Sequence, residues 1–234
     1  MMQPPRFPLV IFDLDGTLVD SASDIAEAVN LTLAGFDLAT VSEATVRSWI
    51  GDGVRALLDT ALHHAGSALP PEQAMPAFMR HYGDSLLKNP RVYDHVPELL
   101  EALSAAGATL AICTNKPERF VAPLLAHVGL ADRFAAIIGG DSLAERKPDP
   151  LPLLHLAQRF GHAPERCVMV GDSATDAAAA IAAHMPLVLV RHGYARGFDL
   201  DQAGALAVVD DMRQLHTLLQ APDHGFREGH DEAV

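Results

Sequence analysis

Short apolar runs alternate with longer, helix-type segments along most of the chain. Five runs have the length and continuous apolar character of parallel strands that are buried on both faces: Leu9–Phe12, Thr109–Cys113, Ala135–Ile138, Cys167–Val170 and Leu187–Val190. Segments with helical patterning lie between the later runs, near residues 117–129, 150–160 and 175–184. This alternation predicts an α/β fold, a doubly wound parallel sheet with right-handed crossovers.

The stretch between the first two predicted strands is too long for one crossover. Its patterning is almost entirely helical, in four segments at Ser21–Gly35, Ser42–Ile50, Val54–Ala65 and Pro71–Lys88. We therefore expect a core made of residues 1–20 and 91–220, and a helical subdomain of residues 21–90 inserted after the first strand. Pro97 and Glu98 are typical of a helix start, and should open the helix that leads to the second strand. The polar, aperiodic residues 221–234 should form a loose tail.

The composition is that of a folded, acidic protein. Hydrophobic residues make up 49% of the 234 residues, which permits a sizeable core, and the formal net charge of −13 disfavours binding to nucleic acid or to an anionic membrane. The first residues lack the apolar region of a signal peptide, and no apolar run approaches the ~18 residues of a membrane span. We expect a cytoplasmic protein, either a monomer or a homodimer, in which Cys113 and Cys167 are buried thiols rather than a disulfide.

Polar residues gather where the predicted strands end. The first strand leads into Asp13-Leu14-Asp15-Gly16-Thr17 and the second into Thr114-Asn115-Lys116. The fourth leads into Gly171-Asp172-Ser173, with Asp176 one helical turn later, and Lys147 lies just before a helix start. Because ligands bind outside the carboxyl ends of parallel strands, we expect these side chains to converge on one rim of the sheet.

The residue types on this rim suit metal-assisted chemistry on a phosphate group. Two carboxylates two residues apart at the end of a strand should point the same way, raise each other's pKa and require a counter-ion. Carboxylate oxygens are ligands for Mg²⁺, and an aspartate can attack phosphorus to form an aspartyl-phosphate. Thr114 can donate to a phosphoryl oxygen, and Lys147 can neutralise charge in the transition state.

In order and spacing, these motifs resemble those of the haloacid dehalogenase-like hydrolase superfamily over nearly the whole chain. The motifs are Asp-Leu-Asp-Gly-Thr, a strand-end Thr, Lys-Pro-x-Pro and Gly-Asp-Ser-x-x-Asp. Within that superfamily, Thr114-Asn115-Lys116-Pro117 and the segment from Arg47 to Gly53 look like the phosphoglycolate phosphatase family. The resemblance implies a Mg²⁺-dependent phosphatase for a small phosphorylated metabolite, with 2-phosphoglycolate as the first candidate.

The resemblance also implies a role for each residue of the rim. Asp13 would be the nucleophile, and Asp15 would protonate the leaving group and then activate water. Mg²⁺ would be held by Asp13, the backbone carbonyl of Asp15 and Asp172, with Asp176 in support. The phosphate would be bound by Thr114, Asn115 and Lys147.

The inserted helices match the small helical cap that closes over the site in this superfamily. Gly51 lies in a loop that we expect to face the substrate. Arg47 has two interpretations: it reaches a carboxylate of the substrate, since arginine suits bidentate recognition, or it forms a surface salt bridge.

Other functions share parts of this pattern. A phosphatase for another small metabolite would use the same residues. A sugar-phosphate mutase similar to β-phosphoglucomutase would keep the phosphoenzyme long enough to return the phosphoryl group, and water access under the cap separates it from a phosphatase. A dehalogenase is disfavoured by Asp15. A signalling receiver domain also surrounds a phosphorylated aspartate with acidic residues, Thr and Lys, but it is close to half this length and lacks the insertion.

Overall fold

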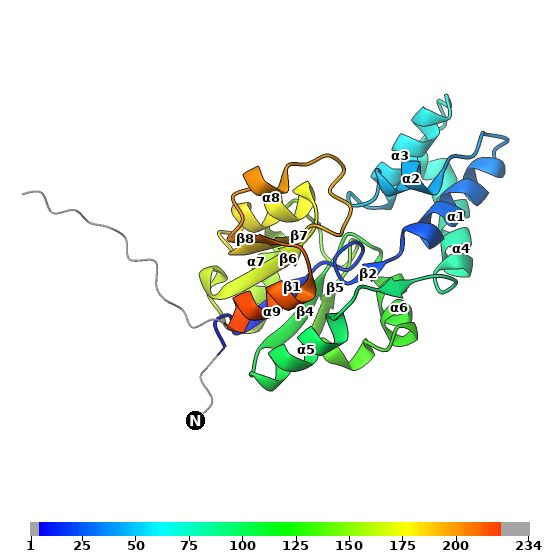
Figure 1. Cartoon of the computed structure of the whole chain (residues 1–234). Coiled ribbons are helices and arrows are strands. Elements are labelled where there is room, and N and C mark those ends of the chain that lie inside the picture. Colours follow the sequence, from blue (N-terminus) through cyan, green and yellow to red (C-terminus); the bar gives the residue numbers. More distant parts are fainter. Residues whose placement is uncertain (1–4, 221–234) are drawn as a thin grey trace, which may run out of the picture.

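Six parallel strands form the central sheet of the structure, a computed structural model that describes residues 5–220 (Figure 1). Their order across the sheet is β5-β4-β1-β6-β7-β8. The strands are β1 Leu9–Phe12, β4 Thr109–Cys113, β5 Ala136–Ile138, β6 Cys167–Gly171, β7 Leu187–Val190 and β8 Ala207–Val209. The predicted α/β fold with a parallel sheet is confirmed, and the five predicted strands agree with the observed ones to within one residue at each end. The sequence analysis missed β8, a three-residue strand at the edge of the sheet.

Helices cover both faces of this sheet. They are α5 Val96–Ala105, α6 Val121–His127, α7 Leu151–Arg159, α8 Ala174–Ala182 and α9 Met212–Gln220. Alternate residues of β1 enter two separate cores: Val10 and Phe12 join the core that contains α5, α6 and α9, and Leu9 and Ile11 join the core that contains α7 and α8. Burial on both faces is the reason that the strands are apolar at every position.

Four helices lie between β1 and α5 in the sequence. They are α1 Ala22–Ala34, α2 Glu43–Arg47, α3 Val54–His64 and α4 Pro71–Ser85, and we call them and their connecting loops the helical insertion. Figure 1 shows the insertion as a group to one side of the sheet. The chain enters it through β2 (Val19–Asp20) and leaves it through β3 (Arg91–Val92), and these two short strands pair antiparallel. The pairing holds entry and exit together, so that the insertion joins the core at one place.

Three smaller expectations concern single segments. Cys113 and Cys167 are buried free thiols, as predicted. Within residues 5–220, the helices are too short or too polar to cross a bilayer. The expected tail at 221–234 lies outside the described residues.

Candidate active site

The loops after β1, β4 and β6 bring the expected polar residues to one edge of the sheet. Asp13 follows β1 directly, and its backbone N–H still bonds to the Val170 carbonyl of β6 at 2.9 Å. Thr114 follows β4, and its N–H bonds to the Ile138 carbonyl of β5 at 2.9 Å. The hydrogen bonds between strands therefore continue one residue past β1 and β4, and they fix the backbone positions of Asp13 and Thr114.

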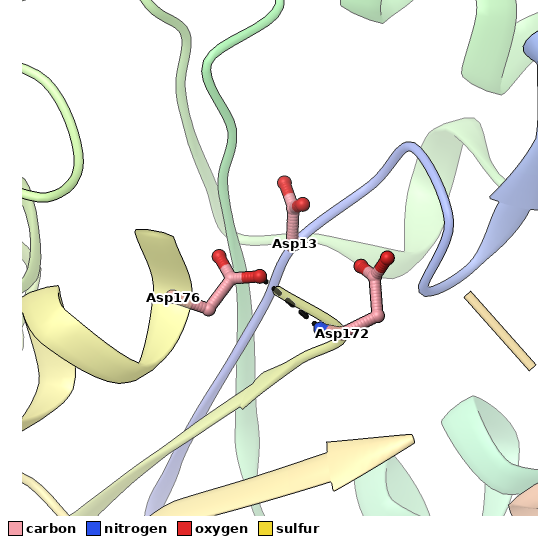
Figure 2. Close-up of side chains that lie close together, drawn as sticks. All are labelled: Asp13, Asp172 and Asp176. Carbon is pink, nitrogen blue, oxygen red and sulfur yellow. Dashed lines mark hydrogen bonds between the residues drawn. The ribbon is translucent and has the colours of Figure 1, made fainter. Parts of the chain in front are cut away.

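Three carboxylates, two from the loops after β1 and β6 and one from the first turn of α8, point toward one another (Figure 2). Asp13, Asp172 and Asp176 each offer an oxygen, and these oxygens lie within 4.8 Å of one another. Burial raises the pKa of Asp13 to about 6; Lys147 opposes the shift, and Asp176 and Asp15 add to it. Burial also raises the pKa of Asp172 well above its usual range, with Asp176 and Asp13 adding to the effect. The cluster is thus a buried site that favours a cation.

Asp176 already uses its oxygens within the protein. Its Oδ2 accepts from the backbone N–H groups of Asp172 and Ser173, both at 3.1 Å, and from the Ser173 hydroxyl at 2.6 Å. Ser173 in turn caps α8, so the two residues form a reciprocal capping box. Its Oδ1 accepts from Lys147 Nζ at 2.6 Å. These bonds fit the supporting role that the sequence predicts.

The Asp172 carboxylate is held by two hydrogen bonds and lies against the backbone of two glycines. Its Oδ1 accepts from the Thr17 hydroxyl at 2.7 Å, and its Oδ2 accepts from the Tyr194 backbone N–H at 2.6 Å. Gly16 and Gly193 lie so near that a Cβ on either would overlap the Asp172 carboxylate. Two glycines are therefore required to seat this carboxylate.

These residues fit a divalent cation. Within residues 5–220, Asp13 Oδ1 is one of the buried side-chain atoms that have no hydrogen-bond partner, and it faces the carboxylate cluster. Lys147 Nζ lies 3.0 Å from it, as an ionic contact without hydrogen-bond geometry. Hard carboxylate oxygens are the ligands that Mg²⁺ prefers, and Mg²⁺ needs only one or two of them beside substrate oxygens and water. Asp13 and Asp172 are suited to that task.

Asp13 and Asp15 each have their own lysine, which supplies the expected counter-ions. Lys147 is buried between Asp13 and Asp176, and Lys116 Nζ donates to Asp15 Oδ1 and Oδ2 at 2.8 and 3.1 Å. Burial disfavours the charge on both lysines, but their carboxylate partners raise the pKa of each above its usual value.

Asp13 and Asp15 line the same pocket, and both lie in the loop directly beyond β1, which ends at Phe12. Gly16 then turns the chain with a φ of 93°. Asp15 also accepts from the Ser21 hydroxyl at 2.5 Å, on the side of the helical insertion. The loop geometry thus assigns the two carboxylates to different partners.

A cavity of about 50 Å³ separates the core from the helical insertion. The wall that the core contributes is polar: Asp13, Asp15, Thr114, Asn115 and Lys116. The insertion contributes Gly51 and Gly53 of one loop and mostly apolar side chains: Ile25, Ile50, Val54, Leu57, Phe78 and Tyr82. Five of the predicted site residues, Asp13, Asp15, Gly51, Thr114 and Asn115, therefore border a space suited to a small molecule.

Two of the predicted phosphate ligands hold parts of the protein in place here. Asn115 Nδ2 donates to the carbonyls of Gly51 and Lys147 at 3.0 and 2.8 Å, so both of its N–H groups are engaged. The Thr114 hydroxyl accepts from the Lys116 backbone N–H at 3.2 Å, which leaves its proton to donate into the cavity. Thr114 is therefore placed to meet a phosphoryl oxygen, and Asn115 connects the Gly51 loop to the core.

Arg47 is not among the residues that line the cavity. Its guanidinium lies 3.0 Å from Asp20 and 3.3 Å from Glu43, and it stacks over the Tyr194 ring at 5.0 Å. In this structure Arg47 therefore forms a surface salt bridge, the second of the two interpretations given for it above. Contact with a substrate carboxylate stays a prediction.

Two residues that shape the site were given no role from the sequence. Lys116 was expected on the rim, but its pairing with Asp15 was not, although the need of that carboxylate for a counter-ion was the available signal. Arg196 bonds to both oxygens of Asp52 at 2.6 and 2.9 Å, and Asp52 Oδ1 also accepts from Thr175 at 2.6 Å. No local pattern points to Arg196, because its partner lies 144 residues away in the sequence.

Comparisons with known proteins agree with this site. The family model described as haloacid dehalogenase-like hydrolase matches residues 7–184. Phosphoglycolate phosphatases of Colwellia psychrerythraea and Rhodospirillum rubrum are 41% and 43% identical, over 88% and 92% of this chain and 94% and 92% of theirs. A crystal structure of a predicted phosphoglycolate phosphatase from Haemophilus somnus superposes with a TM-score of 0.86 at 36% identity, covering 92% of this chain and 99% of that one. The chain belongs to the haloacid dehalogenase-like hydrolase family, in the group of phosphatases that these relatives represent.

Proposed function

We propose that the substrate of this phosphatase is 2-phosphoglycolate, and that Asp13 attacks it with Mg²⁺ bound at Asp13 and Asp172. The observation that carries the proposal is the Asp13 carboxylate, whose Oδ1 is buried and has no hydrogen-bond donor although it lies beside Lys147 and a second carboxylate. The names of the relatives support the choice of substrate. A family resemblance alone does not fix a substrate, so the pocket and the assay below must decide it.

The chemistry has two steps. In the first, an Asp13 oxygen bonds to phosphorus while the bond from phosphorus to the glycolate oxygen breaks, and Asp15 gives that oxygen a proton. In the second, Asp15 removes a proton from water, the water oxygen bonds to phosphorus, and the Asp13–phosphorus bond breaks to release phosphate. Bound Mg²⁺ would reduce the repulsion between Asp13 and the anionic phosphate.

The neighbouring side chains would hold the phosphoryl group during both steps. Lys147 is fixed by Asp176, so its charge is already oriented when negative charge grows on the phosphoryl oxygens. Thr114 has a hydroxyl proton available for one of those oxygens. Asn115 would bind phosphate only by exchanging one of its two present bonds, to Gly51 or to Lys147.

We further propose that residues 21–90 act as a cap on a core of residues 1–20 and 91–220. The loop of Gly51, Asp52 and Gly53 meets the core at Asn115 and Arg196, so the insertion contacts the core beside the cavity. Closure would exclude bulk water while Asp15 directs one water molecule. The net charge of −13 supports a small-molecule substrate rather than nucleic acid or an anionic membrane, and we propose a cytoplasmic location. We propose that the protein acts either as a monomer or as a homodimer.

Measurement of released phosphate tests this function. The purified protein is given 2-phosphoglycolate, sugar phosphates, nucleotides and pyrophosphate, each with Mg²⁺ and with a chelator. We expect the highest kcat/KM for 2-phosphoglycolate, loss of turnover with the chelator and recovery when Mg²⁺ is added back. A higher kcat/KM for a sugar phosphate, or isomerisation of one without phosphate release, would refute the assigned substrate.

A further inference from the structure

The wall of the cavity contains a buried lysine that the phosphoryl chemistry does not use. Lys116 is one of three lysines in the chain, and its side chain is 1% exposed. Its Nζ donates to both oxygens of Asp15 and to the hydroxyl of Tyr82 on α4. A buried charge is costly unless it is fully paired, so a fold with no use for this ammonium would gain by replacing it.

Lys116 is the cation that the cavity presents to a ligand. Among the described residues that line this cavity, it is the one basic side chain, since Lys147, which contacts Asp13 and Asp176, lines a neighbouring hollow instead. The facing wall from the helical insertion is apolar apart from Tyr82. A polyhydroxylated tail would lose water there without gaining hydrogen bonds, whereas a short tail with one anionic group would meet Lys116.

The covalent structure of the proposed substrate also places its carboxylate next to Lys116. In 2-phosphoglycolate a single methylene group separates the ester oxygen from the carboxyl carbon. The ester oxygen must meet Asp15, which protonates it under the proposed function. The substrate carboxylate must then lie beside Asp15, where an anion that is removed from water needs a cationic partner. Lys116, bonded to both oxygens of Asp15, stands at that place.

We propose that Lys116 Nζ, assisted by the hydroxyl of Tyr82, binds the carboxylate of the substrate and thereby sets specificity for short phosphorylated acids. An ammonium has three N–H donors. Exchange of the longer Asp15 contact, at 3.1 Å, would free one donor for the substrate while the 2.8 Å contact keeps Asp15 in place. Tyr82 accepts from Nζ, so its own proton is left to donate to the same carboxylate. This inference rests on the proposed function.

A pair of matched substrates tests the proposal. 2-Hydroxyethyl phosphate has the same length and the same ester oxygen as 2-phosphoglycolate, but it carries a hydroxymethyl group where 2-phosphoglycolate carries the carboxylate. The readout is the selectivity ratio, kcat/KM for 2-phosphoglycolate divided by kcat/KM for 2-hydroxyethyl phosphate. Lys116→Met should lower this ratio on the order of 10- to 100-fold, the range for one charge-assisted hydrogen bond, mainly through KM for 2-phosphoglycolate. Lys116→Arg should retain more of the ratio than Lys116→Met.

The controls separate recognition from positioning. Tyr82→Phe should lower the ratio by a few-fold. Lys88→Met removes an exposed lysine that pairs with Glu27, and it should leave the ratio unchanged. If Lys116→Met reduces turnover of both substrates by the same factor, Lys116 only positions Asp15 and the proposal is overturned. If the wild type fails to hydrolyse 2-phosphoglycolate, the proposed function itself fails, and that result is distinct from an unchanged ratio.

A measurement on the wild type covers the case in which Lys116→Met does not fold. The non-hydrolysable 3-phosphonopropionate should inhibit more strongly than propylphosphonate, which lacks the carboxylate, on the order of 10-fold or more. Equal inhibition by the two compounds would overturn the proposal.

Discussion

The contact between Asp52 and Arg196 should determine how firmly the helical insertion closes on the core. Asp52 lies in the loop of the insertion that borders the cavity, and Arg196 lies in the core between β7 and β8. The guanidinium binds both carboxylate oxygens of Asp52, and the hydroxyl of Thr175 at the start of α8 binds one of them as well. Asp52→Ala removes all three hydrogen bonds and no other part of the loop.

The size of the effect follows from the number of bonds and their exposure. A buried hydrogen bond to a charged group contributes about 1.5–3 kcal/mol. Here the side chains of Asp52 and Arg196 are 44% and 20% exposed, so solvent weakens the pair. We therefore expect about 1–2 kcal/mol for the whole set. That energy corresponds to a change of roughly 5- to 30-fold in the equilibrium between closed and open protein.

Steady-state kinetics with 2-phosphoglycolate measure this change. If substrate binds to the closed form, Asp52→Ala should raise KM by up to about 30-fold, most where the open form already predominates, with a smaller effect on kcat. Arg196→Ala should have a similar effect, and the double variant should add little, which indicates coupling between the two positions. Asp59→Ala, on the exposed face of α3, makes the same change of charge without a core partner and should keep the wild-type KM. A wild-type KM for Asp52→Ala, or full additivity in the double variant, would refute the reasoning.

Three further changes test other parts of the structure. Gly193→Ala puts a Cβ into the space of the Asp172 carboxylate, and a titration of activity should show about 10- to 100-fold weaker activation by Mg²⁺ in a protein with unchanged circular dichroism. Tyr194→Phe removes the hydroxyl that donates to Asp20 at 2.7 Å, so the free energy of unfolding in urea should fall by about 1–2 kcal/mol. The Arg196 guanidinium and the Thr175 hydroxyl lower the pKa of Asp52, while burial opposes this shift and Arg146 adds to it. The stabilising effect of the Asp52 carboxylate is therefore present above the usual aspartate pKa, and it is lost as pH falls through the lowered pKa. The difference in Tm between the wild type and Asp52→Ala should accordingly shrink on acidification from neutral pH to below that value; a constant difference would contradict it.

Local patterns were sufficient to predict the core and much of the catalytic rim. The apolar runs predict buried strands, and the rule that ligands bind at the carboxyl ends of parallel strands selects the residues that follow them. Asp13 and Asp172 were expected together on this basis, and they do contribute to one carboxylate cluster although they are 159 residues apart in the sequence. The short edge strand β8 could not be predicted, because the sequence Ala-Val-Val is too brief to show a period and is only partly buried.

Local patterns could not predict which charged side chains pair with each other at the cavity. Lys116 is 101 residues from Asp15, and its other partner, Tyr82, lies on a helix of the insertion. Which lysine pairs with which aspartate depends on how separate loops of the core pack together, and no run of residues encodes that. The same holds for Arg196, whose loop between β7 and β8 has no motif. Tertiary packing, rather than a local motif, thus shapes the part of the pocket that we propose selects the substrate.

The most direct test of the account is detection of the phosphoryl group on Asp13. The wild-type protein is mixed with Mg²⁺ and 2-phosphoglycolate, quenched in acid within milliseconds, digested, and analysed by mass spectrometry. We predict that the peptide containing Asp13 carries one phosphoryl group on Asp13, and that Asp13→Asn, which keeps the shape of the side chain, shows neither this mass nor turnover. Turnover by Asp13→Asn, or a phosphoryl group on another residue, would contradict the central claim.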